Sequence, residues 1–381
     1  MLDRAWKAVN LEYTDKLPLL AVIGEDLAEK VTGVKIKGVK DPAERMRRLY
    51  EALDVDMMYT LGVKFDVIWS GRKPKLGRGY FEDLKEDFPY TDAFHVAYKG
   101  LKLARSKSAS QLWVVERPFK TYEDLLRYLK RYDPRDDEPR SVSEIACEYR
   151  EVYQTYREIL DRVTLVAGEF YLTLFTYLII HIGWPLLVKL AFKDPEILDD
   201  LLVKYAEVAR KHVEAWSRAG IKVFFSHDDI AWKNGLFFPV YWYRRHIKPL
   251  WREIWKPIKD KGIKLIYVSD GDYRLLMDDI IDAGADGFHI EWDPRLSHKD
   301  MEELARKYGD SKILAISPSY EAMMHGSTQE AVAEAEWISD LAKKYPAIFL
   351  AEIPGKPENI LAFCKTWISK RMRKPCAQVD A

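Results

Sequence analysis

The amino-acid sequence predicts an α/β protein, a (β/α)8 TIM barrel with a helical and hairpin insertion in its N-terminal part. From the middle of the chain onward, short β-rich runs alternate with helical patterns, as in βα units around a parallel sheet. Most of these runs are continuously apolar, which is typical of strands buried on both faces. Six such strands are expected: Val163–Phe170, Lys222–Ser226, Lys264–Val268, Gly287–Glu291, Lys312–Ile316 and Ile348–Ala351.

A barrel of eight strands needs two more, and the N-terminal region supplies candidates. Leu17–Ile23 is one of them, and the other is either Val55–Thr60 or Phe65–Trp69, a choice that the sequence leaves open. A flavodoxin-like or Rossmann sheet is the alternative architecture, but no GxGxxG motif follows a strand. The missing motif favours the barrel, and we expect no nucleotide cofactor.

The helices between the strands have recognisable boundaries. One begins after Asp194-Pro195 and ends at Gly220, and its apolar residues at three- and four-residue spacing predict that it packs one face. A second, from about Val240 to Lys261, contains Pro249 and Pro257. Because proline lacks the N–H that a helix interior needs, we expect a kink or a break at these positions.

The chain is expected to form a single domain over residues 1–381. No repeat and no Gly/Ser- or Pro-rich linker divides it. Residues 70–161 are predicted to be an insertion within the barrel, with a hairpin near Gln111–Glu116 and helices at Tyr122–Tyr132 and Ser143–Leu160.

Composition excludes several classes of protein. Sixty lysines and arginines balance sixty aspartates and glutamates, so no overall charge attracts nucleic acid or an anionic membrane. The cysteines, Cys147, Cys364 and Cys376, are too far apart for a disulfide framework or a thiolate metal cage. Charged residues make up 31% of the chain and amides are few, which favours a heat-adapted source. The first residues contain no apolar signal, so a reducing cytoplasm is the expected location.

One apolar run, Phe170–Val188, approaches the length of a membrane span and is uncharged if His181 is neutral. It follows directly from a predicted strand and contains Gly183 and Pro185. Long apolar runs can equally be buried core, and we therefore expect no membrane association.

Functional side chains of such a barrel gather at the carboxyl ends of its strands. The segments found there are His227-Asp228-Asp229, Ser269-Asp270-Gly271-Asp272, His289-Ile290-Glu291, Ser317-Pro318-Ser319-Tyr320 and Glu352-Ile353-Pro354-Gly355. Carboxylates that converge on one mouth repel one another unless a cation binds there or some of them stay protonated as general acids. The sequence therefore predicts an acidic site at this end of the barrel.

The candidate catalytic residues are Asp229, Asp270, Glu291 and Asp228. Structural alternatives exist for them, because Asp228 or Asp229 can cap the following segment and Asp270 can form an Asx-turn. Glu291 ends an apolar run, where a carboxylate pointing inward is costly to leave unpaired.

The candidate substrate-binding residues are Glu169, His227, His289, Trp232, Tyr320 and Glu352. For Glu169 the alternative is a salt bridge, and for His289 it is a hydrogen-bonded histidine of the barrel interior. Trp232 opens an aromatic stretch that continues to Tyr243 and could wall a pocket for an aromatic ring or a methylated cation. The alternatives for this stretch are core packing or a homodimer surface near Tyr241, so the oligomeric state stays open.

These segments resemble the uroporphyrinogen decarboxylase superfamily, which includes corrinoid-linked methyltransferases. The resemblance rests on Ser226–Ala231 with Gly235 and Pro239, Val268–Asp272 leading to Asp282–Asp286, His325–Glu330, and Pro357-Glu358-Asn359-Ile360. Weaker similarity covers Leu2–Leu19 and Pro118–Pro134. The resemblance as a whole implies a barrel enzyme, but it is less specific for the reaction.

Departures from the superfamily narrow what the resemblance implies. The decarboxylases carry arginines in the loop after the first strand, whereas Val22–Asp26 is acidic here. Their histidine at the eighth strand is missing from Glu352–Gly355, and the zinc-binding His-x-Cys of the thiol-activating methyltransferases is replaced by Val268 and Asp270. What remains is a mouth rich in oxygen ligands.

The resemblance therefore implies an enzyme that moves a methyl group from a small methylated donor to a corrinoid on a partner protein. Activation of the donor could come from a divalent metal such as zinc on Asp270 and Glu291, or from a carboxyl group of raised pKa. The alternatives are a porphyrinogen decarboxylase and a non-catalytic barrel that binds a ligand or a corrinoid protein. Arginines that reach the mouth, such as Arg72, Arg78 or Arg244, would favour the decarboxylase.

Overall fold

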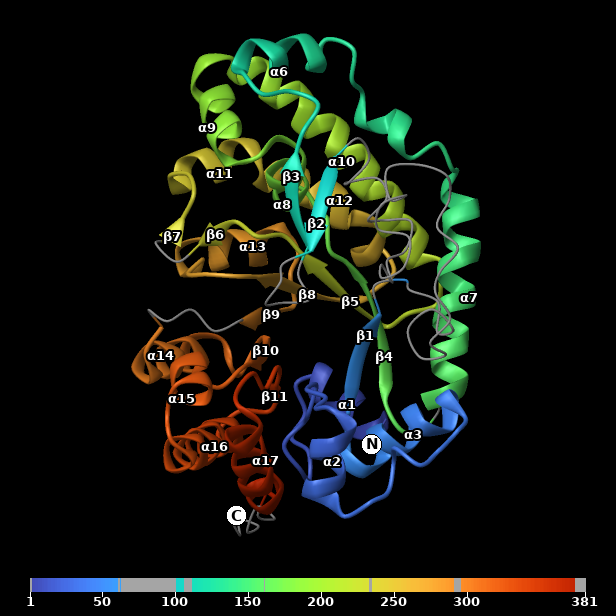
Figure 1. Ribbon diagram of the computed structural model, residues 1–381, viewed down its shortest axis with the longest axis vertical. Coiled ribbons are helices and arrows are strands. Elements are labelled where there is room, and N and C mark those ends of the chain that lie inside the picture. The colour runs from blue at the N-terminus through green and yellow to red at the C-terminus, as the bar shows by residue number, and fades with distance from the viewer. Residues whose placement is uncertain are drawn as a thin grey trace, which may run out of the picture.

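A computed structural model of the chain describes residues 2–60, 62, 101–105, 112–160, 162–232, 235–290 and 296–373. Seven parallel strands at its centre follow the order β1-β4-β5-β8-β9-β10-β11 (Figure 1). Their bounds are Met57–Thr60, Leu165–Phe170, Val223–His227, Lys264–Ser269, Gly287–Ile290, Ile313–Ile316 and Ile348–Leu350. The six C-terminal strands predicted from apolar runs are thus confirmed, and β1 identifies Val55–Thr60 as the strand that precedes them. The competing Phe65–Trp69 lies outside the described residues.

The segment around Leu19 closes the barrel between β11 and β1. The N–H of Leu20 donates to the carbonyl of Leu350 at 2.8 Å, and the N–H of Asp56 donates to the carbonyl of Leu19 at 2.8 Å. Only a single parallel bridge, from Leu19 to Leu350, joins this segment to β11, so the predicted strand Leu17–Ile23 is shorter than expected. It nevertheless takes the eighth place, and the predicted (β/α)8 TIM barrel is confirmed.

Small and branched side chains fill the barrel interior. Because side chains alternate across a strand, every second residue points inward. These residues form one buried cluster that includes Leu165, Ala167, Val223, Phe225, Ile266, Val268, Ile313 and Ala315. This alternation also determines which residues face inward at the strand ends.

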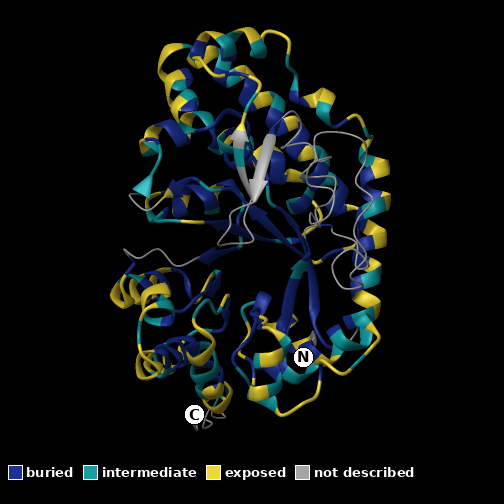
Figure 2. Cartoon of the chain, in the orientation of Figure 1, coloured by how far each residue is buried: buried dark blue, intermediate teal, exposed yellow. Residues whose placement is uncertain are grey.

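Helices cover the outside of the barrel, with their buried sides toward the strands and their exposed sides toward solvent (Figure 2). Before β4 they are α1 Leu2–Val9, α2 Glu25–Thr32, α3 Pro42–Leu53, α6 Tyr122–Leu129 and α7 Val142–Leu160. After β4 they are α8 Phe175–Ile182, α9 Trp184–Lys193, α10 Pro195–Ser217, α11 Val240–His246, α12 Lys248–Lys259, α13 Met277–Ala283, α14 His298–Tyr308, α15 Tyr320–Met324, α16 Thr328–Lys343 and α17 Pro357–Lys370. Two 3-10 turns, Pro134–Asp137 and Arg274–Leu276, complete the described helical segments.

A break occurs near one of the two prolines. It falls at Ile247, between α11 and α12, and Pro249 lies in the first turn of α12, where its missing N–H costs nothing. Pro257 lies inside α12, which continues to Lys259, so the chain does not break there and the kink stays a prediction. The position is close to the end of the helix, which limits how much of it a proline can disturb.

The described parts of the predicted insertion include the hairpin and both helices. Strand β2, Lys102–Arg105, pairs in antiparallel fashion with β3, Leu112–Glu116. Helix α7 packs along α10 and β4, on the right of Figure 1. The boundaries of the insertion and the single-domain organisation remain predictions.

The apolar run after β4 folds into two helices, α8 and α9. Among the described residues, no single helix is long and apolar enough to cross a membrane. The α8–α9 pair reaches the required length and composition together, but it is bent by 110° at Gly183. Burial lowers the pKa of His181 in α8 to about 3, so this histidine is neutral, and it contacts the hydroxyls of Tyr128 and Tyr205.

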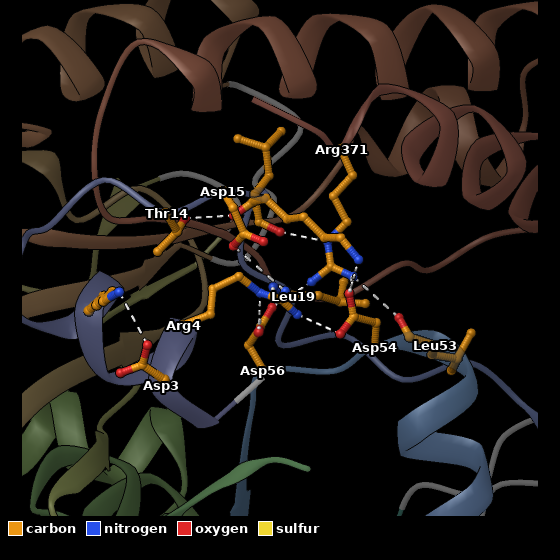
Figure 3. Close-up of polar contacts among 12 residues, drawn as sticks. Asp3, Arg4, Thr14, Asp15, Leu19, Leu53, Asp54, Asp56 and Arg371 are labelled. Atoms are coloured by element: carbon orange, nitrogen blue, oxygen red, sulfur yellow. Dashed lines mark hydrogen bonds and ion pairs between the residues drawn. The ribbon is translucent and has the colours of Figure 1, made fainter. Parts of the chain in front are cut away.

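A cluster of buried charges lies at the amino end of β1, where Arg4 of α1 approaches Arg371 after α17 (Figure 3). Arg4 in α1 and Arg371 after α17 each contact the fully buried carboxylate of Asp56 at 2.5 Å. Asp54 bridges the same two arginines at 2.6 and 3.1 Å. We call these four residues the Asp56 clasp.

Candidate functional site

Polar side chains replace the apolar core at the carboxyl ends of the strands. Glu169 follows Leu165 and Ala167 in the inward series of β4, and His227 follows Val223 and Phe225 in that of β5. His289 pairs with Val268 on one side and Ala315 on the other, so it also points inward. By the same alternation Tyr59 and Ser317 belong to this layer, and Asp270 follows β8 at the exposed rim. The predicted polar mouth is therefore built from residues of six neighbouring strands.

His227 lies between two carboxyl groups. Its Nε2 is 3.1 Å from Oδ1 of Asp229, and its Nδ1 is 3.6 Å from Oε1 of Glu169. The ring of Tyr171 packs against it with 4.1 Å between centroids. The other oxygen of Glu169, Oε2, is buried and has no hydrogen-bond partner among the residues described.

Asp229 is held by backbone contacts on both sides. Its own N–H donates to Oγ1 of Thr176 at 2.6 Å, and its Oδ1 accepts the N–H of Asp270 at 3.1 Å. Asp229 and Asp270, which are 41 residues apart in the sequence, are therefore neighbours at the mouth.

The electrostatics of this group follow from burial and from the close charges. Burial opposes the charge on His227, but Asp229 and Glu169 outweigh it and raise the pKa of this imidazole well above its usual value. Burial likewise disfavours ionised Asp229, yet the His227 cation holds the pKa of this carboxyl below its usual range. At Glu169 burial dominates and raises the pKa, with His227 opposing it.

A pocket of about 380 Å³ opens beside this group. Val22 from the closing segment, Tyr59 from β1, His289 from β9 and Glu352 after β11 line it. None of the described residues around it is a lysine or an arginine. The floor position of His289 is fully buried, and both of its ring nitrogens lack a hydrogen-bond partner in the described part of the chain. Burial and the nearby His227 cation lower the pKa of His289 to about 3, so the ring is neutral.

Glu352 lies at the rim of this pocket. The surrounding protein raises the pKa of its carboxyl, and the charges of Asp270 and Glu169 add to this while His227 opposes it. These influences reach Glu352 from β4, β5 and β8, so the carboxyl groups of Glu169, Asp229, Asp270 and Glu352 converge on one mouth. Within the described residues, no lysine or arginine forms an ion pair with any of the four.

Asp228 faces away from this group. Its Oδ1 accepts the N–H groups of Thr176 and Leu174 at 2.9 and 3.3 Å, and its Oδ2 accepts the indole N–H of Trp251 at 2.9 Å. Burial raises the pKa of this carboxyl to about 6. Asp228 therefore caps a helix, but this helix is α8, which precedes it in the chain, and not the following segment. The catalytic roles of Asp228 and Asp229 stay predictions.

Replacing Asp228 with asparagine is expected to lower the free energy of unfolding by about 1–3 kcal/mol. The carboxylate accepts hydrogen bonds at both oxygens, whereas the NH₂ group of asparagine would face either Trp251 or the backbone of α8 donor to donor. Urea unfolding measures the loss. A D228N variant as stable as the wild type would show that this carboxylate does not cap α8.

Trp232 and Tyr320 lie at the edge of the mouth, with 44% and 42% of their surface exposed. Trp232 belongs to a small hairpin of β6, Ala231–Trp232, and β7, Gly235–Leu236. This hairpin packs on Gly271, where a Cβ would lie 2.8 Å from the backbone nitrogen of Trp232 and where φ is +77°. Glycine thus allows the hairpin to approach the loop that contains Asp270.

The predicted metal site rests partly on a residue outside the described chain. Glu291 lies there, so its role and the Asp270–Glu291 pair remain predictions. Among the residues described, no three His, Cys, Asp or Glu side chains are placed to hold a metal ion. We therefore derive no step through a metal.

Sequence reasoning missed Thr176 and Trp251, which hold Asp229 and Asp228 in place, and Tyr59, which lines the pocket. These residues carry no motif, and their roles depend on contacts between distant segments. Tyr59 alone had a usable signal, because it occupies an inward position at the end of a predicted strand.

Comparison with solved structures agrees with the barrel architecture. The fold is similar to that of a methyltransferase from Methanosarcina mazei, with a TM-score of 0.61 and 15% identity over 97% of this chain and 98% of that chain. A sugar phosphate isomerase/epimerase from Parabacteroides distasonis aligns with a TM-score of 0.40 and 8% identity over 93% and 96% of the two chains, too distant to support an argument. No curated protein matches the sequence.

The family model described as uroporphyrinogen decarboxylase (URO-D) matches residues 107–349. The match spans β3 to β11 and includes the strands that carry Glu169, His227, Asp270 and His289. It covers well over half of the sequence, and the chain belongs to the uroporphyrinogen decarboxylase family.

Proposed function

We propose that this protein transfers a methyl group from a small methylated donor to a corrinoid on a partner protein, and that the acidic mouth protonates the leaving group. Membership of the family and a fold shared with a protein described as a methyltransferase support this kind of reaction. The single observation that carries the proposal is the convergence of Glu169, Asp229, Asp270 and Glu352 on one mouth, where two of these carboxyl groups have a raised pKa and no described lysine or arginine pairs with any of them.

The chemistry balances with the groups that are present. The bond between the methyl carbon and an oxygen or nitrogen of the donor breaks, and its electron pair stays on that oxygen or nitrogen. A carboxyl group of raised pKa gives its proton to this atom, which then leaves as a neutral alcohol, phenol or amine. The corrinoid would supply cobalt(I), whose electron pair forms the new bond to the methyl group.

The residues of the mouth have distinct roles in this proposal. His289 is neutral and can both donate and accept a hydrogen bond, so it would orient the polar atom of the donor. Glu169 and Glu352 are the two carboxyl groups of the mouth whose pKa is raised, mainly by burial, and they would act as the acid. Trp232 and Tyr320 would form the apolar rim, and Asp270 would add negative charge opposite Glu352.

A methyl-transfer assay under anaerobic conditions tests the proposal. The purified protein is mixed with free cob(I)alamin and a panel of methyl ethers, methanol and methylated amines, and methylcobalamin is followed by its absorbance. We expect methylcobalamin to form with at least one donor and not with protein heated to unfolding. If no donor in the panel is demethylated while a porphyrinogen is decarboxylated, the proposal is wrong.

The second candidate is a porphyrinogen decarboxylase, which the description of the family favours. Such a substrate carries several carboxylates, which need basic side chains to bind them. Arg45 and Lys37 already pair with Glu25 and Asp26 of the loop after the first strand. Arg244 pairs with Asp279, and Arg72 and Arg78 lie outside the described residues. Release of CO₂ from uroporphyrinogen or coproporphyrinogen by the wild-type protein would decide in favour of this candidate.

A further inference from the structure

The Glu169–His227–Asp229 group is asymmetric. A buried imidazole touches a carboxyl group with each of its nitrogens, and the two contacts differ. The Asp229 contact, at 3.1 Å, is a hydrogen bond, whereas the Glu169 contact, at 3.6 Å, is longer than a hydrogen bond. The imidazole of His227 is thus hydrogen-bonded to Asp229 but not to Glu169.

We propose that these three residues form a proton-sharing chain in which Asp229 is a positioning residue for His227, and Glu169 is the proton donor of the mouth. The proposal rests on the proposed function only for the identity of the group that accepts the proton. The assignment of the proton-sharing residues depends only on the contacts of His227 with Asp229 and Glu169.

Asp229 is suited to hold His227 as a cation. Its Oδ1 accepts hydrogen bonds from His227 and from the N–H of Asp270, and its own N–H is fixed by Thr176. Donors that point at a carboxylate stabilise its ionised form, which agrees with the lowered pKa of Asp229. With Nε2 bound to an ionised carboxylate, the imidazole keeps its second proton on Nδ1, directed at Glu169.

Glu169 has the opposite environment. No N–H group of the described residues donates to Oε2, and the carboxyl is almost completely buried. An ionised carboxylate there would lack the hydrogen bonds that normally stabilise it, so the protonated form is favoured. When the gap to Nδ1 closes, the proton of His227 can move to Oε1, and a proton on Oε2 is then free to leave for a ligand.

Glu169 is not one of the residues that line the pocket, but it lies on the strand next to one of them. Ala167 pairs with pocket-lining Tyr59 across β4 and β1, and Glu169 is the next inward residue of β4. Glu352, the other carboxyl of raised pKa, lies at the exposed rim, where it exchanges its proton with water and has no described histidine contact. Of the two carboxyl groups, only Glu169 is both shielded from water and in contact with a histidine that can supply a proton.

Other titratable groups lie close to Glu169, His227 and Asp229 and interact electrostatically with them. They are His289 from β9, whose pKa is lowered by the His227 cation, together with Glu352 and Asp270 at the rim. His289 stays neutral while His227 is charged, so the two histidines take separate roles in one cavity. Loss of the charge on His227 would remove this separation.

Histidine NMR of the full chain tests the chain of contacts without any assay of activity. In the wild type we expect the His227 ring to stay protonated well above the usual pKa of histidine. Asp229→Asn should lower its pKa by about one pH unit or more, and Glu169→Gln by less. The matched control is Glu352→Gln, which removes a carboxyl without a contact to His227 and should leave its titration nearly unchanged.

Activity provides the second readout. Glu169→Gln should lower kcat by about 100-fold or more, and Glu169→Asp should restore part of it, since a carboxyl is again present. In the wild type the rate should fall as pH rises through the pKa of His227, the internal proton source, and Asp229→Asn, which lowers this pKa, should move the fall to lower pH. A merely structural role of Asp229 would lower stability without moving the pH profile.

Three results would overturn the proposal. They are a wild-type His227 that titrates at its usual pKa, an Asp229→Asn variant with unchanged His227 titration, and a Glu169→Gln variant with wild-type kcat. If the wild type transfers no methyl group at all, the proposed reaction is wrong. The NMR titration still decides whether Glu169, His227 and Asp229 share a proton.

Discussion

Replacing Arg371 with methionine should lower the free energy of unfolding by about 3–5 kcal/mol. Asp56 is completely buried, and Arg371 supplies one of its two guanidinium partners at 2.5 Å. The same side chain donates from Nε to the carbonyl of Leu17 at 2.6 Å, at the segment that closes the barrel. Methionine is similar in length but leaves both acceptors without this donor. Urea unfolding followed by circular dichroism measures the effect.

A matched control uses an exposed lysine that contacts the Asp56 clasp from outside. Lys16 contacts Asp54 at 3.1 Å, but its side chain is about one third exposed. Because water replaces an exposed ion pair at little cost, Lys16→Met should change the free energy of unfolding by less than about 1 kcal/mol. Equal losses in the two variants would show that burial of the Asp56 clasp is not what stabilises the barrel seam.

Replacing His289 with leucine is expected to separate binding from stability. In a methyl-transfer assay the variant should lose about 30- to 100-fold in kcat/KM, the effect of one buried hydrogen bond to the ligand. The fold should become no less stable, because both ring nitrogens are buried without described partners and leucine removes their desolvation cost. Thermal unfolding and steady-state kinetics measure the two quantities on the same preparation.

His212 provides the control for this substitution. It is equally buried, but its Nδ1 lies 2.8 Å from the hydroxyl of Tyr149 and its Nε2 lies 3.1 Å from Glu138. His212→Leu should therefore destabilise the protein, since it leaves Glu138 and Tyr149 without a partner. If His289→Leu is destabilised to the same extent, His289 is a structural residue of the barrel and not a ligand contact.

The strands were predictable because each is a short apolar run buried on both faces. Such a run predicts a strand even when its neighbours in the sheet are unknown. The seam was harder to predict. Leu17–Ile23 has the composition of a strand, but only the region around Leu19 pairs with β11 and leads into β1. Composition reports burial, whereas the length of pairing depends on the two strands beside it.

The site shows the same division. Its location followed from the carboxyl ends of parallel strands, and the convergence of Glu169, Asp229, Asp270 and Glu352 agrees with it. The roles of Asp228 and Asp229 could not be separated, because adjacent residues point in different directions and only the partners Thr176 and Trp251 reveal which one caps α8. The contact of His227 with Glu169 joins residues 58 positions apart and has no local signature.

The Asp56 clasp links the order of synthesis to the order of folding. Arg4 and Asp56 leave the ribosome early, whereas Arg371 emerges only after every strand of the barrel has been made. Until then the nascent chain carries a carboxylate with only part of its final charge compensation, next to an open edge between Leu19 and Leu350. The Asp56 clasp can therefore be completed only after the last helix has been made, and until then Asp56 lacks one of its two guanidinium partners at the seam of the barrel.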